Sequence, residues 1–240
     1  MRGGDVVKIK AGIYRERLNL YMTSEQIGTF SEQNPLVIGP YGDGEVIIDV
    51  SPTPMTWTMH DTDIFVADWE HEKDPWAVIL HDNYKDCRDK QSLAEITSYG
   101  LWFFDTETRK IYINTAGSNP IDLDVVISYN DRSSEHYAVK LNGLSHIHVY
   151  GLTLRGAARY GLTDYPGGDD IVIEKCSIKF NNNTGVRLFS ENSKMIKNNV
   201  WGNVLYNWPR GRTWAADGGW GQGMTISNNG QASGNIIHDN

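Results

Sequence analysis

The stretches GLSHIHVYGLTLRGAARYGLT (143–163) and GDDIVIEKCSIKFNNNTGVRL (168–188) repeat one pattern of apolar residues and glycines. Ile147 lies 24 residues before Ile171, and Leu154 lies 24 residues before Ile178. A period in the low twenties is typical of a solenoid, in which each coil of the chain stacks on the next.

The segments within each repeat are short, rich in β-branched residues and alternate between apolar and polar side chains. This alternation favours strands over the leucine-rich repeat, which has a similar period but a fixed LxxLxL pattern and helical segments. Parallel strands that stack about 4.8 Å apart through right-handed crossovers form a parallel β-helix. We therefore predict an all-β fold, a right-handed parallel β-helix (solenoid).

The repeat continues beyond residue 188 at changed spacings. SKMIKNNVWGN (193–203) aligns at an offset of 23, and ASGNIIHDN (232–240) aligns on it at an offset of 36. The difference of about 13 residues lies in a long loop, 206–223. The pairs expected to stack are Val139 with Leu162, Val186 with Met224, Ile173 with Ile196, Ile178 with Trp201, and Asn199 with Asn235.

The first 50 residues contain GDVVKIKAGIYRERLNL (4–20) and NPLVIGPYGDGEVIIDV (34–50). These stretches resemble the opening coils of pectate-lyase-like β-helix proteins. In that family an amphipathic helix usually caps the first coil, and no such helix precedes residue 4 here. Because a solenoid needs covered ends to stay soluble, we expect a fragment of a longer chain, or a partner that covers the open ends.

Residues 51–135 do not follow the repeat, and they contain alternating strands such as GLWFFDTETRKIYI (100–113). DTETRK reads as the turn of a hairpin. The hairpin resembles one in the β-sandwich inserted in some β-helix glycoside hydrolases, of the β-xylosidase type. We therefore predict three parts: first coils at 1–50, a small antiparallel β-sandwich at 51–135, and further coils at 136–240. The aromatic side chains of the insertion are expected in its core.

The chain of 240 residues has 22 Lys and Arg against 30 Asp and Glu, a net charge of −8. Such an acidic chain is a poor general binder of nucleic acid. It has no apolar run of 18 residues, so no membrane span is expected. The residues after Met1 do not form a signal peptide. A secreted or periplasmic location, which the resemblance implies, would therefore need a signal that is no longer on this chain.

The repeat also predicts a column of outward side chains on one sheet. Because side chains alternate along a strand, inward Val139 and Val186 place Lys140, Thr163, Arg187 and Thr225 outside. Asp164 falls in the inward register, where an unpaired carboxylate is costly. We therefore expect the strand to end early and Asp164 to turn out at the sheet edge.

The loop YNWPRGRTWAADGGWGQG (206–223) leads directly into the last strand of that sheet, so it overhangs the same column. Tryptophan faces stack on the apolar faces of sugar rings, and arginine forks bind carboxylates. The alternative is that the tryptophans only pack the loop onto the sheet. The predicted substrate-binding residues of this loop are Trp208, Arg210, Arg212, Trp214 and Trp220.

Two reactions fit this arrangement. A polysaccharide lyase holds a uronate and removes the neighbouring proton, work suited to Lys140 and Arg187. A glycoside hydrolase needs two carboxylates, about 5–5.5 Å apart for retention or about 6.5–9.5 Å for inversion. Two pairs are available for hydrolysis, Asp164 with Asp217 and Asp164 with Glu191.

Clustered carboxylates suit Ca²⁺, so Asp169 and Asp170, together with Asp164, form a candidate metal site. The sequence leaves open whether Ca²⁺ or no cofactor is needed. The predicted function is cleavage of glycosidic bonds in a polysaccharide or oligosaccharide, by hydrolysis or elimination. The alternative from another class is a non-catalytic β-helix that binds or assembles glycans, because fold alone does not decide activity.

Overall fold

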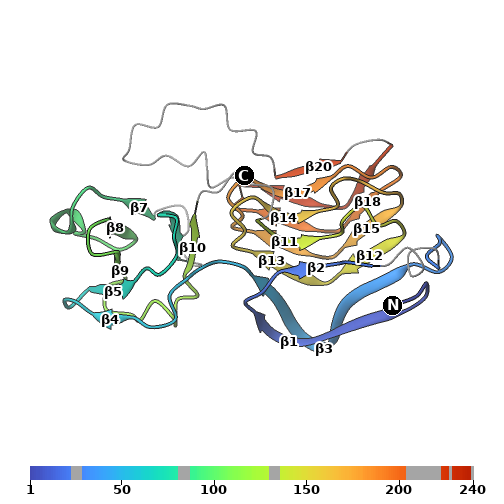
Figure 1. Ribbon diagram of the computed structural model, residues 1–240. Coiled ribbons are helices and arrows are strands. Elements are labelled where there is room, and N and C mark those ends of the chain that lie inside the picture. The colour runs from blue at the N-terminus through green and yellow to red at the C-terminus, as the bar shows by residue number, and fades with distance from the viewer. Residues whose placement is uncertain (23–28, 81–86, 130–135, 204–222, 227–228, 239–240) are drawn as a thin grey trace.

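The computed structural model describes residues 1–22, 29–80, 87–129, 136–203, 223–226 and 229–238. Their regular structure is almost all β, with one short 3₁₀ helix, η2 (Leu93–Glu95). Figure 1 shows a stack of parallel strands on one side of the molecule, the strands of the insertion on the other, and β10 between them.

Three columns of parallel strands make up the stack. The strand β3 (Leu36–Asp49) runs through two columns, because Leu36–Ile38 pair with one column and Val46–Asp49 with the other. Strand β1 (Val6–Tyr14) lies parallel to β3 along both parts. The first column continues with β12 (Ile147–Tyr150), β15 (Ile171–Glu174), β18 (Lys194–Ile196) and β21 (Gln231–Ser233). The second continues with β13 (Leu152–Arg155), β16 (Ser177–Lys179), β19 (Asn199–Trp201) and β22 (Ile236–His238).

The third column is a separate sheet of five strands: β2 (Leu18–Asn19), β11 (Tyr137–Lys140), β14 (Tyr160–Thr163), β17 (Thr184–Leu188) and β20 (Met224–Ile226). All of its pairings are parallel. Parallel sheets in an all-β chain form a β-helix-like fold. The handedness of the coil stays a prediction.

The register predicted from the repeat is confirmed between the middle coils. Ile147 pairs with Ile171 and Leu154 with Ile178. Val139 also pairs with Leu162, and Val186 with Met224. Inward positions are closely packed, and Ile173 has no exposed surface. The 24-residue period thus identified the inward face of these coils.

The register predicted for the following coil is wrong by one residue. Ile173 pairs with Met195, not Ile196, and Ile178 pairs with Val200, not Trp201. A shift of one residue exchanges the two faces of a strand. Met195 and Val200 are fully buried, whereas Ile196 and Trp201 are half-buried outside the coil. The strands of this coil follow their partners by 22 residues, whereas the predicted alignment used 23.

The predicted pairing of Asn199 with Asn235 is wrong for the same reason. The side-chain amide of Asn198 donates to Asn235 Oδ1 at 2.9 Å, and Asn199 pairs with Ile236. Asn181 and Asn203 form an equivalent contact at another corner, also at 2.9 Å. These buried amides also bond backbone groups, so they satisfy the polar groups of the turns as the chain changes direction.

The insertion lies between β3, which ends at Asp49, and β11, which begins at Tyr137. It contains a five-stranded sheet and a two-stranded antiparallel ladder. The sheet has the order β4 (Thr58–Met59), β5 (Ile64–Asp68), β9 (Lys110–Asn114), β8 (Leu101–Asp105) and β7 (Arg88–Asp89), and the ladder is β6 (Pro75–Ile79) with β10 (Val126–Tyr129). The predicted hairpin is confirmed as β8–β9, which pair antiparallel.

Both layers of the insertion bury side chains in one cluster, which includes Phe65, Trp102 and Ile111 from the sheet and Val78 and Ile127 from the ladder. Trp102 is only 4% exposed. The expectation of core packing therefore holds for the inward residues of the hairpin. The division of the chain at residues 50 and 135 and the classification of the insertion as a β-sandwich stay predictions.

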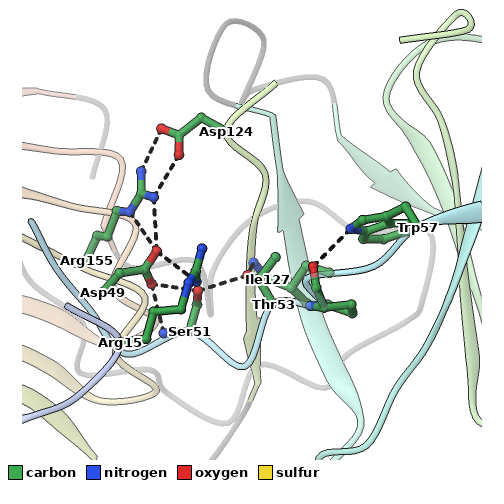
Figure 2. Close-up of polar contacts among 9 residues, drawn as sticks. Arg15, Asp49, Ser51, Thr53, Trp57, Asp124, Ile127 and Arg155 are labelled. Carbon is green, nitrogen blue, oxygen red and sulfur yellow. Dashed lines mark hydrogen bonds and ion pairs between the residues drawn. The ribbon is translucent and has the colours of Figure 1, made fainter. Parts of the chain in front are cut away.

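A buried polar network joins the insertion to the coils (Figure 2). Arg155, at the end of β13, donates from Nε to Asp49 Oδ2 at 3.0 Å and from Nη1 and Nη2 to both carboxylate oxygens of Asp124, at 2.6 and 2.7 Å. Asp49 Oδ1 accepts from Ser51 Oγ at 2.6 Å. Through Thr53 the network reaches the backbone N–H of Ile127 in β10.

The charges of this network support one another. Burial alone would lower the pKa of Arg155, but its hydrogen bonds with Asp124 and the charge of Asp49 outweigh burial and raise it. Lys179, one coil further along the same column, shows the opposite balance. Burial and the charge of Arg155 lower the pKa of Lys179. Asp49 and Asp124 therefore stabilise the positive charge of Arg155, whereas burial and the charge of Arg155 disfavour the charged form of Lys179.

Within the described ranges, no helix has the length and apolar character needed to cross a membrane.

Candidate functional site

The third column brings the predicted polar side chains together. Lys140 pairs with Thr163, Thr163 with Arg187, and Arg187 with Thr225, in successive strands of the sheet. Their inward neighbours Val139 and Val186 have no exposed surface. The four residues therefore lie in one column, where Lys140, Arg187 and Thr225 are half-buried. Thr163, also expected outside, is only 2% exposed.

Two tyrosines lie beneath these cations. Tyr137 pairs with Tyr160, and both are nearly buried. The ammonium of Lys140 lies 5.1 Å from the ring centre of Tyr137. Arg187 donates from Nη1 to the Tyr160 hydroxyl at 2.9 Å. The guanidinium of Arg187 also lies 4.7 Å from the ring centre of Phe189, so three contacts with aromatic side chains hold it in place.

Two further cations extend the same surface. The guanidinium of Arg17, just before β2, lies 5.9 Å from the ring centre of Tyr137. That of Arg159 lies 4.7 Å from the ring centre of Tyr160. We call this surface the tyrosine–cation face, and it consists of Tyr137, Tyr160, Arg17, Lys140, Arg159 and Arg187. It gathers positive charge in a chain whose net charge is −8.

His136 connects the tyrosine–cation face to the insertion. Its Nδ1 lies 2.9 Å from Arg17 Nη2, which can only donate, and 2.6 Å from the hydroxyl of Tyr129. Tyr129 ends β10 of the insertion, and its ring lies 3.9 Å from that of His71.

Sequence reasoning missed these supporting residues. Tyr137 and Tyr160 are separated by the same 23 residues as Val139 and Leu162, so the repeat contained a signal for this pair. Arg17, Tyr129 and His136 carry no such signal, because they come from the first coils, the insertion and the following coils and meet only in the fold.

Asp164 does not turn out at the sheet edge, and that expectation is wrong. Its side chain is fully buried. Oδ1 accepts from the backbone N–H of Phe189 and Oδ2 from that of Ser190, both at 2.8 Å. These two backbone donors offset the free-energy cost of burying the carboxylate. Asp164 therefore supports the corner between two coils, out of reach of a ligand on the tyrosine–cation face.

Glu191 directly follows Ser190, whose backbone N–H donates to Asp164. It is exposed, and its backbone forms a bridge with Asp169 and accepts from the N–H of Asp170. Because the Asp164 carboxylate is turned into the interior, Asp164 and Glu191 do not present a pair of carboxylates on one surface.

The two candidate metal ligands have other partners. Asp169 Oδ1 accepts from the side-chain amide of Asn192 at 2.8 Å, and Asp170 Oδ2 lies 3.1 Å from His146 Nδ1. Both aspartates line a cavity of about 310 Å³. The part of the chain that the structure describes contains no group of three or more His, Cys, Asp or Glu side chains that could hold a metal ion. Asp164 therefore does not complete a Ca²⁺ site with Asp169 and Asp170.

Asp217 and the predicted substrate-binding residues of the long loop lie outside the described residues. They are Trp208, Arg210, Arg212, Trp214 and Trp220.

Comparison with known proteins gives the fold alone. No protein-family model and no curated protein sequence matches this chain. Two solved structures resemble it, one described as "The complex structure of XylC with xylose" and one as "Glycoside hydrolase". The first has a TM-score of 0.57 at 11% identity over 86% of this chain, and the second 0.56 at 11% over 84%. The chain spans 50% and 60% of the lengths of these two proteins. It shares the fold of a xylose-bound protein and of a glycoside hydrolase.

Proposed function

We propose that this protein binds a polysaccharide or oligosaccharide on the tyrosine–cation face and cleaves its glycosidic bonds. The observation that carries the proposal is the position of Arg187, half-buried and held by Tyr160 and Phe189 one coil away from Thr163. A cation fixed in this way is ready for an anionic or hydroxyl-bearing ligand before the ligand arrives. The fold shared with a xylose-bound protein and a glycoside hydrolase also favours a sugar.

The cations of the face favour an acidic sugar and an elimination reaction. A guanidinium binds a uronate carboxylate, and Lys140, placed two coils from Arg187, serves as the base. Lys140 takes the proton next to the carboxylate, and the electrons of that C–H bond form a carbon–carbon double bond as the bond to the leaving oxygen breaks. The leaving oxygen takes a proton from water and departs as a hydroxyl group. The fold neighbours favour hydrolysis instead, with water adding across the broken bond and two carboxylates assisting.

The product distinguishes the two reactions. The protein is incubated with neutral polysaccharides and with polygalacturonate, and both reducing ends and the absorbance of unsaturated uronate are followed. Elimination raises both signals, whereas hydrolysis raises reducing ends alone. The Asp169–Asp170 pair does not assemble a Ca²⁺ site with Asp164, so no step is assigned to the metal. The same assay with and without a chelator tests whether the reaction requires Ca²⁺.

Arg187→Ala tests the site. We expect kcat/KM to fall about tenfold or more, since a charge-assisted contact is removed from the ligand. Arg187→Lys should recover part of the loss, because charge is restored without the bidentate fork. Arg88→Ala is the matched control, because Arg88 is exposed in the insertion. Turnover equal to that of the unaltered protein in Arg187→Ala would place the reaction elsewhere.

A second function, glycan binding without cleavage, is favoured by Asp164, whose carboxylate is bonded to two backbone groups inside the coil. This candidate predicts retention on polygalacturonate, weakened by Arg187→Ala, with no rise in either product signal.

We also propose a secreted or periplasmic location, where such polymers are found, and a right-handed solenoid carrying a β-sandwich. Far-ultraviolet circular dichroism cannot separate handedness, so a crystal structure tests the last two points.

A further inference from the structure

The outer face of the inserted five-stranded sheet carries a row of side chains that does not belong to any core. The row follows the ladder from Thr58 in β4 to Val66 in β5, then to Tyr112 in β9 and Phe103 in β8. Phe65, Ile113 and Trp102, which alternate with these residues, point into the core of the insertion and are buried. Val66, Tyr112 and Phe103 are instead half-buried, and Thr58 is exposed.

The aromatic rings of this row form a continuous surface. Phe103 and Tyr112 stack with ring centres 6.1 Å apart and an angle of 25° between their planes. His60, which is exposed, meets Tyr112 edge-on at 5.2 Å. Neighbouring strands lie about 4.8 Å apart. The row therefore extends across four strands, a length suited to a short oligosaccharide and not to a single small ion.

A cavity of about 880 Å³ adjoins one end of the row, at β4 and β5. Thr58 and Val66 line it, together with Asp68, Glu70, Lys110 and Thr56. This size lies within the range of small-molecule sites, which combine apolar walls with a few polar groups that orient the ligand. Hydroxyl, carboxylate and ammonium groups at this site match the donors and acceptors of sugar hydroxyls.

The charge of the site separates it from the tyrosine–cation face. Lys110 is already paired at this site, because its Nζ lies 3.2 Å from Asp68 Oδ1. Glu70 adds a further negative charge at the rim. Carboxylates repel uronates and phosphates. The ligand that fits an aromatic row beside acidic groups is thus an uncharged glycan.

We propose that the outer face of β4, β5, β9 and β8 is a second carbohydrate-binding site, specific for neutral glycan chains. Sugar rings lie with their apolar faces on Tyr112 and Phe103, and their hydroxyl groups bond to Thr58, Asp68 and Lys110. This site binds without reacting, and it tethers the protein to a neutral polymer. It is independent of the chemistry proposed for the tyrosine–cation face.

The test is electrophoresis of the full chain through native gels that contain hydroxyethylcellulose, soluble xylan or polygalacturonate. Phe103→Leu/Tyr112→Leu keeps apolar volume and removes both rings, so the fold is retained. We expect its affinity for a neutral polymer to fall about tenfold or more, as for aromatic anchors elsewhere. Tyr112→Phe should bind as the unaltered protein does. Tyr41→Ala is the matched control, because Tyr41 is exposed on β3, outside the row.

Loss of neutral-polymer binding in Phe103→Leu/Tyr112→Leu, with turnover on the tyrosine–cation face retained, separates this site from the proposed reaction. Retention of the unaltered protein by polygalacturonate alone would overturn the proposal. Equal retention of the double variant and the unaltered protein by a neutral polymer would overturn it as well. A thermal scan of each variant confirms that a loss of binding is not a loss of folding.

Discussion

Arg155→Met tests whether the buried network of Figure 2 holds the coils and the insertion together. Arg155 is 1% exposed at its side chain and Asp49 is 0% exposed. Methionine fills most of the same space without a charge. The change leaves Asp49 buried with its Ser51 bonds and with Arg15 at 3.4 Å. Breaking a buried pair by removing one partner costs about 3–5 kcal/mol.

The remaining partners of Asp49 place the expected loss near the lower end, at about 3 kcal/mol. Domains of this size lose about 2–4 °C in Tm per kcal/mol, so Tm should fall by about 6–12 °C. Urea unfolding followed by circular dichroism and by tryptophan fluorescence measures the free energy of unfolding. Four tryptophans of the described residues lie in the insertion, namely Trp57, Trp69, Trp76 and Trp102. The chain has eight tryptophans, so fluorescence reports on the insertion and on the rest of the chain together.

Two further variants decide the cause of the loss. Asp124→Asn should cost only about 1 kcal/mol, because the Asp124 side chain is 43% exposed and water replaces part of the interaction. Adding Asp49→Asn to Arg155→Met should recover part of the loss, since the uncompensated charge is then gone. A cost below about 1 kcal/mol for Arg155→Met, or a double variant less stable than Arg155→Met alone, would refute this account.

Three other outcomes follow from buried groups in the coils. Ile173→Asp places an unpaired carboxylate at a fully buried position and should prevent soluble folding, because the cost is several kcal/mol; soluble protein with an unchanged melting curve would contradict the register. Asp164→Ala orphans the N–H groups of Phe189 and Ser190 and should lower the free energy of unfolding by about 2–5 kcal/mol, whereas a change below about 0.5 kcal/mol in urea unfolding would show that water replaces the carboxylate. Burial raises the pKa of the Cys176 thiol to about 12, so the unfolded chain loses this proton first as pH rises. The stability that Cys176 contributes is therefore full below about pH 9 and declines between about pH 9 and 12; Cys176→Ala should flatten this decline in unfolding measured at a series of pH values, and an unchanged slope would contradict the assignment.

The inward positions of the middle coils could be predicted from the sequence, because their parallel strands recur at a spacing of 23 to 24 residues. Ile147, Leu154 and Val139 each find their predicted partner one coil away. The same arithmetic placed Lys140, Thr163 and Arg187 in one column, since alternation along a strand fixes the outward residues once the inward ones are known.

Prediction failed where the spacing between coils changes and where burial depends on backbone groups of the next coil. The coil at β18 and β19 is two residues shorter than its predecessor, so alignment by hydrophobicity alone chose Ile196 and Trp201 over Met195 and Val200. Asp164 failed for a related reason. Its burial depends on backbone N–H groups of the next coil, 25 and 26 residues away, and these donors have no signature in side-chain identity.

What the sequence determined by itself is therefore the part of the molecule governed by short-range rules: strand alternation, the 24-residue spacing of the middle coils and the β8–β9 hairpin. Only the tertiary structure brought Arg17, Tyr129 and His136 into contact around the tyrosines, and Arg155 to Asp49 and Asp124. These contacts join residues 7 to 119 positions apart in the chain. No periodicity connects such residues, because their approach is fixed by how the insertion packs on the coils.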